Sequence, residues 1–292
     1  MELVLPAKPP FSYLAVAQSH GWAQLEPFIW APETHRLAYF LRLCNGHVVR
    51  LDFGPTEGGL LVRFNQDLDE EEMRQVAGTA EWMFGLGLDL SPFYEHARRE
   101  PKLAHVIPEA RGRVLRSPTV FEDVIKTILT TNVQWGGTIR MVRELVQAYG
   151  EPWPADEAWR AFPTPQRLAQ ESLEDFTARV RLGYRAPYIL ELARKVASGE
   201  LDLESLKSSD LPTSELRKEL LAIKGVGGYA AANLLMILGR FDAIPIDSWA
   251  HKMVSNEFYH GEPVTPAQIE EVFAPWGEYK GLAYWFWNWS EV

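Results

Sequence analysis

The sequence predicts an α+β fold in which an N-terminal antiparallel β-sheet precedes an all-α bundle. Short segments rich in leucine, β-branched and aromatic residues, separated by turn dipeptides, come first along the chain. From about Asp69 onward the apolar residues recur at helical spacing instead. We therefore expect a sheet domain over residues 1–100 and a helical domain over residues 101–292, a length that allows a proper core.

Three segments are expected to form the sheet. Leu37–Leu43 and His47–Phe53 flank Asn45-Gly46, a dipeptide that favours type I′ hairpin turns because both central residues take positive φ. Gly58-Gly59 precedes the third segment, Leu60–Phe64. These turn signals predict antiparallel pairing between neighbouring segments.

Helix starts are marked by side chains that can cap free backbone amides. Thr119 and Glu122 have the spacing of a capping box, in which each side chain accepts from the amide of the other residue. Thr164-Pro165 and Thr265-Pro266 combine a cap with proline at the first helical position, where the missing N–H would have had no hydrogen-bond partner within the helix. Further helical patterns cover residues 187–197 and 213–222.

The composition excludes several classes of protein. The chain has 29 basic and 39 acidic residues and a net charge of −10, which disfavours coating nucleic acid through bulk charge but allows a local basic face. Cys44 is the only cysteine, which excludes an internal disulfide, a cysteine zinc site and a four-cysteine iron–sulfur cluster. No apolar stretch reaches membrane-spanning length and the start lacks a signal-peptide pattern, so we expect a cytoplasmic protein without membrane contact.

A glycine-rich turn joins two helical segments near residue 225. The run from Leu220 to Leu235 reads LLAIKGVGGYAAANLL, in which one helix ends near Ile223 and the next opens on small alanines. Glycine lets a backbone turn sharply and approach a ligand, and the amides at a helix start attract an anion. The turn is therefore a candidate phosphate site, with an ordinary interhelical turn as the alternative.

Asp247 heads the helical segment that follows, 18 residues after Tyr229 (247 − 229). Its simplest role is an N-cap, in which the carboxylate accepts from helix amides. A capping carboxylate is fixed in orientation, so this role is compatible with a catalytic one.

Four stretches along the chain carry a resemblance to a known family: Phe121–Gln134, Leu182–Ala186, Ile223–Gly227 followed by Pro245–Asp247, and Trp276–Ala283. In this order they resemble the helix-hairpin-helix (HhH-GPD) base-excision DNA glycosylases. The Leu182–Ala186 stretch is similar to an element of the 8-oxoguanine glycosylases, and Trp276–Ala283 resembles a helix start shared with 3-methyladenine DNA glycosylase II. The resemblance extends over most of the chain, and the N-terminal sheet matches the extra domain of these two groups.

The resemblance implies DNA repair by hydrolysis of the N-glycosidic bond of a flipped, damaged base. It gives Asp247 the catalytic role of stabilising an oxocarbenium-like transition state. Bifunctional members carry a Schiff-base lysine where this chain has Tyr229, so the resemblance implies monofunctional cleavage without strand nicking. The missing cysteines separate the chain from the iron–sulfur branch.

The resemblance also implies a pocket for the damaged base. Its expected side chains are Tyr229, Trp249, Tyr284 and Asn288, with Trp285 and Trp287 as further candidates. Core packing is the alternative for each aromatic residue. An aromatic face favours an electron-poor, cationic base, which points to an alkylated purine. The 8-oxoguanine enzymes hold their base with a glutamine and a phenylalanine where this chain has Tyr284 and Asn288.

One expected DNA contact is a loop that fills the gap left by the flipped base. By resemblance Asn132 lies at this wedge, Gln134 belongs to the same loop, and Tyr184 and Arg185 support the opposite strand. The alternatives are a core position for Tyr184 and a surface position without a partner for Arg185.

The hairpin is expected to supply the second DNA contact. The residues expected at the phosphate are Lys224, Gly225 and Gly227. Family hairpins also hold a monovalent cation, Na⁺ or K⁺, through backbone carbonyls, which by position are those of Leu221, Ile223 and Val226.

The preferred hypothesis is a monofunctional glycosylase for alkylated purines that binds damaged double-stranded DNA as a monomer. Tyr229, Asp247 and the absence of cluster cysteines favour it. One alternative is an oxidised-purine glycosylase with lyase activity, favoured by Leu182–Ala186 and Asn132. The other is a non-catalytic helix-hairpin-helix module that only binds DNA or a protein, favoured by the net charge of −10.

Overall fold

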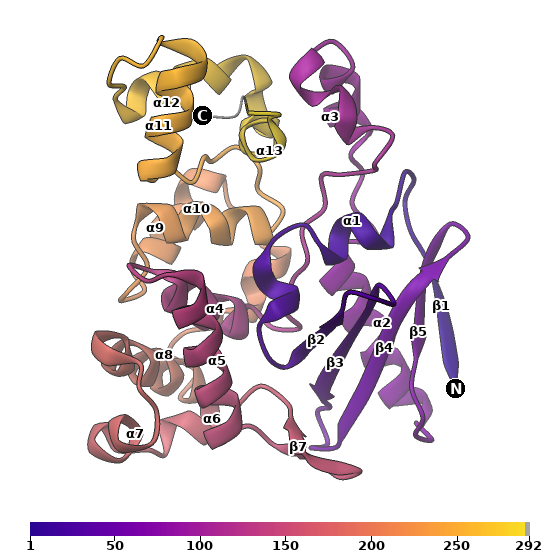
Figure 1. Ribbon diagram of the computed structural model, residues 1–292. Helices are drawn as coiled ribbons and strands as arrows, with labels where there is room; N and C mark the ends of the chain where they lie inside the picture. Colours follow the sequence, from indigo (N-terminus) through magenta and orange to yellow (C-terminus); the bar gives the residue numbers. More distant parts are fainter. Residues whose placement is uncertain (290–292) are drawn as a thin grey trace. The chain divides into compact units, whose positions relative to one another are not determined.

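The computed structural model describes residues 1–289, which form two compact units. Unit 1 comprises Met1–Leu88 and Arg113–Ser208, and unit 2 comprises Asp89–Gly112 and the chain from Ser209 onward. The α+β class is confirmed, because an N-terminal sheet is followed by mainly helical chain (Figure 1). The boundary expected between residues 100 and 101 stays a prediction, since this division does not test where a domain folds by itself.

Unit 1 contains a five-stranded antiparallel sheet in the order β1-β5-β4-β3-β2. Its strands are β1 (Glu2–Pro6), β2 (Phe28–Ala31), β3 (Arg36–Arg42), β4 (Val48–Thr56) and β5 (Gly59–Arg63). The three expected strands correspond to β3, β4 and β5, with ends that differ by up to three residues. The sequence did not single out β1 and β2, whose five and four residues are too few for a clear alternation.

The remaining elements of unit 1 flank the sheet or follow it as helices. They are α1 (Tyr13–Ala17), η1 (Gly21–Gln24), α2 (Glu70–Phe84), α4 (Val120–Thr130), α5 (Trp135–Tyr149), β6 (Pro152–Trp153), β7 (Asp156–Arg160), α6 (Pro165–Ala169), α7 (Leu173–Arg179), η3 (Gly183–Arg185), α8 (Ala186–Ala197) and η4 (Glu204–Ser208). Helix α8 packs against α6 and α7, and α4 packs against α5.

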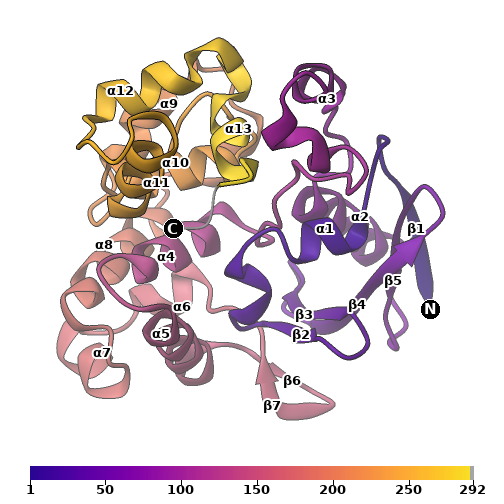
Figure 2. The ribbon, with the colours of Figure 1, turned by 45° about the horizontal axis from the view of Figure 1, so that its top comes forward.

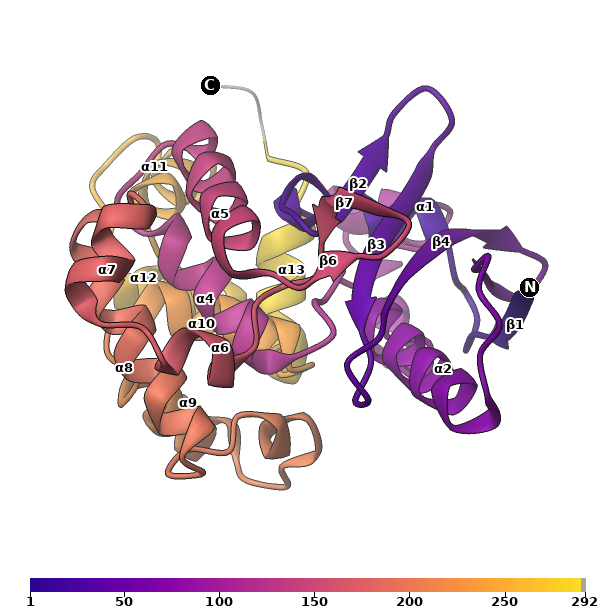
Figure 3. The same cartoon turned by 90° about the horizontal axis from the view of Figure 1, so that it is seen from below.

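The sheet buries apolar side chains on both faces because its residues alternate between them. On one face the ring centroid of Phe53 lies 5.0 Å from that of Phe84 in α2. On the other face Phe40 lies 5.3 Å from Trp153 and 5.4 Å from Trp159, both in the β6–β7 hairpin. Figure 3 shows α2 and this hairpin on opposite sides of the sheet.

Unit 2 is helical within the described residues and groups its helices together (Figure 2). They are α3 (Ser91–Ala97), η2 (Pro101–Val106), α9 (Thr213–Leu221), α10 (Gly228–Ile237), α11 (Ser248–Phe258), α12 (Pro266–Phe273), η5 (Ala274–Tyr279) and α13 (Lys280–Phe286). An ion pair between Lys102 and Glu257 at 2.5 Å ties η2 to α11, and the rings of Phe93 and Tyr279 lie 5.9 Å apart. Residues 89–112 therefore pack with helices that follow more than 100 residues later.

All three expected threonines cap their helices, but one expected hydrogen bond does not form. Thr164 accepts from the amide of Arg167 at 3.1 Å, and Thr265 forms a full capping box with Gln268. Thr119 also caps its helix, accepting from the amide of Glu122 at 3.2 Å. The prediction that the carboxylate of Glu122 accepts from the amide of Thr119 is wrong, because this carboxylate binds the side chains of Tyr39 and Lys126 instead.

Two features concern the described residues as a whole. Between residues 1 and 289, no helix combines the length and apolarity that crossing a membrane requires. In the same residues, no group of three or more His, Cys, Asp or Glu side chains has a metal-binding arrangement. The compartment and the oligomeric state stay predictions of the sequence.

Candidate functional site

The hairpin between α9 and α10 exposes a helix start. The turn requires glycine at position 225, whose φ is +92°, and it closes with a 3.0 Å bond from the amide of Val226 to the carbonyl of Ile223. Gly227 is the N-cap of α10, and among the described residues no side chain caps that helix. A Cβ at Gly227 would meet no atom within 4 Å, and one at Gly228 would lie 3.5 Å from the guanidinium of Arg217. This arrangement suits an anion such as a phosphate.

The other hairpin residues lie around this turn. Lys224 is exposed in the turn, whereas Ile223 and Val226 are buried and Leu221 is exposed at the end of α9. Their main-chain carbonyls are hard oxygen donors, which suit a monovalent cation better than a transition metal.

Asp247 is the N-cap of α11. Its side chain accepts from the amide of Ala250 at 2.8 Å, which confirms the expected cap and fixes the orientation of the carboxylate. Asp247 is partly exposed. The segment leading to it is held by α13, because the amide of Gly281 donates to the carbonyl of Phe241 at 2.6 Å. A Cβ at Gly281 would overlap the carbonyl oxygen of Ala243, so only glycine allows this approach.

Two phenols lie close enough to Asp247 to feel its charge. Burial, and then the negative charge of Asp247, raise the pKa of Tyr229 and of Tyr284. Both phenols therefore stay protonated at neutral pH. Tyr284 is only 4% exposed, whereas Tyr229 is 39% exposed. The charge of the carboxylate thus reaches one buried and one exposed aromatic side chain.

Trp249 extends this aromatic surface. Its ring lies 6.2 Å from Tyr284 and 5.6 Å from Trp289, edge to face in both cases, and the side chain is 47% exposed. Trp287 instead packs 5.6 Å from Phe258 and 5.5 Å from Phe273.

The remaining two pocket candidates are not placed at this surface by a side-chain contact. Asn288 is exposed, and its backbone N–H donates to the carbonyl of Lys102 at 3.0 Å. Trp285 is half-buried. The sequence did not single out Trp289, which is adjacent to Tyr284 at 5.7 Å and whose only signal was its place in a tryptophan-rich end.

A second candidate surface lies in unit 1, on the loop between α4 and α5. Asn132 has a left-handed φ of +49°, and its amide group donates to the hydroxyl of Tyr184 at 3.2 Å. That hydroxyl also lies 3.3 Å from Oγ1 of Thr131. Arg185 stacks 4.4 Å from the ring of Tyr184, and its guanidinium donates to the carbonyl of Thr131. Gln134 is exposed, and its carbonyl starts α5 by accepting from Gly137 at 2.8 Å.

The structure therefore brings Asn132, Tyr184 and Arg185 together, although more than 50 residues separate the first from the others. Arg185 is buried and Tyr184 is exposed, so the alternatives of a surface arginine without a partner and of a core tyrosine are both wrong. Three apolar side chains around this loop are exposed, namely Val133 (37%), Trp135 (36%) and Tyr184 (49%). Their exposure makes this loop a candidate site of interaction.

Both candidate sites lie in a part of the chain that matches a known protein family. The family model described as "HhH-GPD superfamily base excision DNA repair protein" matches residues 125–278, which is more than half of the chain and includes the loop, the hairpin and Asp247. The chain belongs to the HhH-GPD superfamily of base excision DNA repair proteins.

Individual relatives agree with this assignment. The HhH-GPD chain is 31% identical over 209 residues to the DNA-3-methyladenine glycosylase of Bacillus subtilis (strain 168), a match that covers 70% of this chain and 67% of the relative. The 3-methyladenine DNA-glycosylase from Archaeoglobus fulgidus has the same fold, with a TM-score of 0.76, 18% identity and coverage of 98% and 97%. The apo 8-oxoguanine glycosylase/lyase of Clostridium acetobutylicum also shares it, with a TM-score of 0.72, 21% identity and coverage of 98% and 94%.

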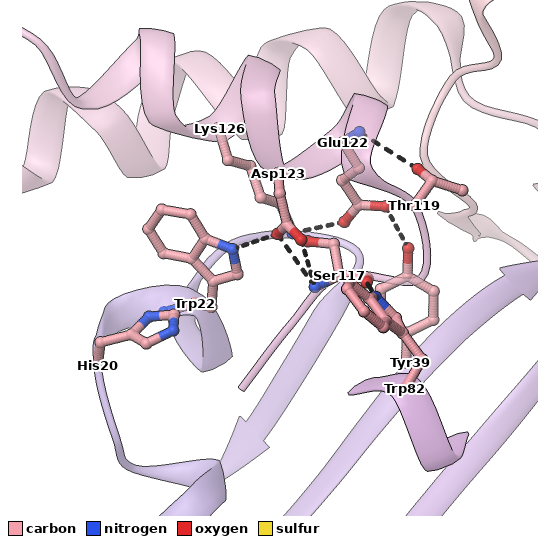
Figure 4. Close-up of polar contacts among 9 residues, drawn as sticks. All are labelled: His20, Trp22, Tyr39, Trp82, Ser117, Thr119, Glu122, Asp123 and Lys126. Atoms are coloured by element: carbon pink, nitrogen blue, oxygen red, sulfur yellow. Dashed lines mark hydrogen bonds and ion pairs between the residues drawn. The ribbon is translucent and has the colours of Figure 1, made fainter. Parts of the chain in front are cut away.

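A buried polar network supports helix α4, which enters the loop in this HhH-GPD protein (Figure 4). Asp123 accepts from the indole of Trp22 at 2.7 Å and from the amide of Ser117 at 3.0 Å. Glu122 accepts from the hydroxyl of Tyr39 at 2.6 Å and pairs with Lys126 at 2.6 Å. These charged groups are almost completely buried, and burial raises the pKa of Asp123 to about 6.

His20 closes the same network, and its lowered pKa predicts a pH-dependent contribution to the stability of the HhH-GPD protein. Its Nδ1 accepts from the amide of Trp22 at 3.2 Å, and its Nε2 lies 2.8 Å from the carbonyl of Leu115. This geometry fits the neutral tautomer that carries its proton on Nε2, and burial lowers the pKa of His20 to about 4.

We expect His20 to stabilise the fold fully above its unfolded pKa of about 6.5, and this contribution to be lost as pH falls towards about 4. Below the unfolded pKa the unfolded chain binds a proton that the folded one rejects. Asp123 acts in the opposite direction between about pH 4 and 6, because its folded pKa is raised. A difference between variants therefore isolates His20 better than the wild-type curve does.

In urea unfolding at several pH values, the free-energy difference between wild type and His20→Asn should shrink by about 2–3 kcal/mol from pH 7 to pH 4. The exposed His260 has a φ of +53°, which asparagine tolerates, so His260→Asn is the matched control at an exposed position. A difference for His20→Asn that does not change with pH would contradict the neutral state of His20 in the folded protein.

Proposed function

We propose that the protein is a monofunctional DNA glycosylase that hydrolyses the N-glycosidic bond of alkylated purines in double-stranded DNA. The observation that carries this proposal is the fixed, partly exposed carboxylate of Asp247 beside the aromatic side chains of Tyr229, Tyr284 and Trp249. Membership of the HhH-GPD superfamily and the similarity to a relative named DNA-3-methyladenine glycosylase support it.

The proposed role of Asp247 follows from the charge that develops during cleavage. Loss of the base leaves positive, oxocarbenium-like charge on the sugar, which a nearby carboxylate stabilises. The bond to the amide of Ala250 holds the carboxylate in place before the reaction, so little reorganisation is needed. The same group is placed to orient the attacking water.

The proposed substrate follows from the aromatic surface. Tyr229 and Trp249 are 39% and 47% exposed, which is unusual for side chains of this size and leaves their faces available to a ligand. Alkylation at a ring nitrogen makes a purine cationic, and a cation is attracted to an aromatic face. The nearby charge of Asp247 favours the same cation.

Tyr229 makes a Schiff-base mechanism unavailable in this proposal. Tyr229 stands at the position where lyases of the family carry lysine, and a phenol forms no imine with an opened sugar. Water is therefore the nucleophile in this proposal, and the DNA strand is left intact.

Two contacts to DNA belong to the proposal. The amides at the start of α10, with Lys224, Gly225 and Gly227, bind a backbone phosphate. Asn132 fills the space of the flipped base, Gln134 binds DNA from the same loop, and Tyr184 and Arg185 support the opposite DNA strand.

A monovalent cation at the hairpin also fits this proposal. The carbonyls of Leu221, Ile223 and Val226 would hold it, and the ion would add positive charge for the bound phosphate. Among the chain's own groups, the turn at Gly225 and the amides of α10 position that phosphate.

The test measures base release from two DNA substrates and covalent trapping on a third. Wild-type protein is incubated with methylated duplex DNA, and the released 3-methyladenine and 7-methylguanine are quantified by liquid chromatography. An 8-oxoguanine duplex and borohydride trapping on abasic DNA run in parallel. We expect methylated purines to be released and no trapped complex to form. Release of 8-oxoguanine with trapping would favour the oxidised-purine alternative, and binding without any release would favour the non-catalytic one.

Replacing Tyr229 tests the aromatic contact to a cationic base. Tyr229→Leu should lower single-turnover release of 7-methylguanine roughly tenfold to thirtyfold, because a desolvated cation–π contact is worth about 2 kcal/mol. The matched control is Tyr229→Phe, which keeps the ring and should stay within about threefold of wild type. Equal losses in both variants would show that the hydroxyl, not the ring, matters.

A further inference from the structure

The short helix η1 touches the chain on both sides of the loop that carries Asn132. It lies in the N-terminal part of unit 1, and its four residues are separated from the loop by more than 100 residues of sequence. The loop itself comprises residues 131–134, between the last residue of α4 and the first residue of α5.

The first contact is to Trp135, the first residue of α5 after the loop. The indole of Trp135 donates to Oε1 of Gln24 at 2.9 Å. Its six-membered ring lies directly against Gly21, where an added Cβ would overlap Cζ2 and Cη2 of the ring. The φ of Gly21 lies outside the left-handed region, so the contact with Trp135, rather than the backbone conformation, explains this glycine.

The second contact is to α4, the helix that precedes the loop. The indole of Trp22 donates to Asp123 at 2.7 Å, and both groups are buried (Figure 4). Asp123 also accepts from the amide of Ser117, so this carboxylate connects α4 both to η1 and to the segment that precedes α4.

Helix η1 is itself held in place. His20 caps it by accepting from the amide of Trp22, and the other ring nitrogen lies 2.8 Å from the carbonyl of Leu115. The amide of Leu115 donates in turn to the hydroxyl of Ser19 at 2.9 Å. A segment that is anchored in this way can restrain its neighbours.

The loop needs such restraint for its proposed work. Asn132 adopts a left-handed backbone conformation, which asparagine tolerates, and its side chain is exposed. Loops carry function best when a rigid scaffold positions them. The bond from Asn132 to Tyr184 is exposed.

We propose that η1 positions the DNA-facing loop, with Gly21, Trp22 and Gln24 acting as positioning residues through Trp135 and Asp123. This inference rests on the proposed function, because the loop is taken to replace the flipped base. Everting a paired base costs a few kcal/mol, and a preformed loop offsets part of that cost. A displaced loop should therefore slow release from a paired lesion while leaving the chemistry at the sugar unchanged.

The test compares two duplexes that carry the same 7-methylguanine. In one the lesion faces cytosine, and in the other it faces an abasic-site analogue, so no pair has to be opened. Gly21→Ala forces the ring of Trp135 to move, and Gln24→Met removes the acceptor at the surface while keeping the side-chain length. Single-turnover release from the paired duplex should fall roughly tenfold to a hundredfold for Gly21→Ala and less for Gln24→Met. Release from the unpaired duplex should stay within about threefold of wild type.

A matched glycine variant and a melting temperature separate positioning from a general loss of structure. A Cβ at Gly78 in α2 would meet no atom within 4 Å, so Gly78→Ala should behave as wild type on both duplexes. Equal losses on the two duplexes, or an unchanged ratio in both η1 variants, would overturn the inference. If wild type releases no base from either duplex, the proposed function fails and this inference fails with it.

Discussion

Replacing Asp247 with asparagine should lower the single-turnover rate of base release from methylated duplex DNA by a factor on the order of 10²–10³. The reason is electrostatic, because asparagine keeps the shape of the side chain but removes the negative charge that stabilises the developing cation. The folded state should be unaffected, since asparagine and aspartate are equally good N-caps and the bond to the amide of Ala250 can be kept.

Two further variants separate the cap from the catalytic charge. Asp247→Ala removes both, so it should lose activity as Asp247→Asn does and also cost about 1 kcal/mol of stability. Asp69 is the capping aspartate of α2, and Asp69→Asn therefore controls for the loss of a capping carboxylate. We expect that variant to release bases at the wild-type rate. Near-wild-type release by Asp247→Asn would remove this residue from the mechanism.

The elements that the sequence predicted share local signals. Strands β3 and β4 are long and separated by Asn45-Gly46, and the starts of α6 and α12 carry a threonine followed by proline. Each signal lies within a few residues of the element it predicts, so a single sequence suffices to find it.

The site was predicted in part for a different reason. The cap at Asp247 is local, but its proximity to Tyr284 depends on α13 approaching the preceding segment at Gly281. The resemblance supplied this long-range information, as it did for Asn132 and Tyr184. It did not supply Trp289, because no motif singles out that ring.

The buried charges could not be predicted. Glu122 and Lys126 are four residues apart on one helix, a spacing that is typical of exposed ion pairs. Their neighbours decide otherwise, since Tyr39 is 83 residues away from Glu122 and Trp22 is 101 residues away from Asp123. Sequence spacing alone gives no access to contacts at such separations, so Glu122 was assigned to a capping box instead.

This buried ion pair yields the second large effect. Lys126→Met should destabilise the protein by about 3–5 kcal/mol, because it leaves the carboxylate of Glu122 buried without its cation. Methionine fills the same space between Phe28 and Phe162, whose rings lie 4.7 and 5.8 Å from the ammonium group, so the loss is mainly electrostatic. Urea unfolding followed by tryptophan fluorescence measures the change.

The double variant Glu122→Gln/Lys126→Met distinguishes a stranded charge from lost packing. Glutamine can still accept from the hydroxyl of Tyr39, and an apolar replacement of a buried pair is often neutral in stability. We therefore expect the double variant to recover at least half of the loss caused by Lys126→Met alone. Arg140 forms an exposed pair with Glu144, and Arg140→Met should change stability by less than about 1 kcal/mol. If the double variant were less stable than Lys126→Met, Glu122 would stabilise the fold through contacts other than its pair with the lysine.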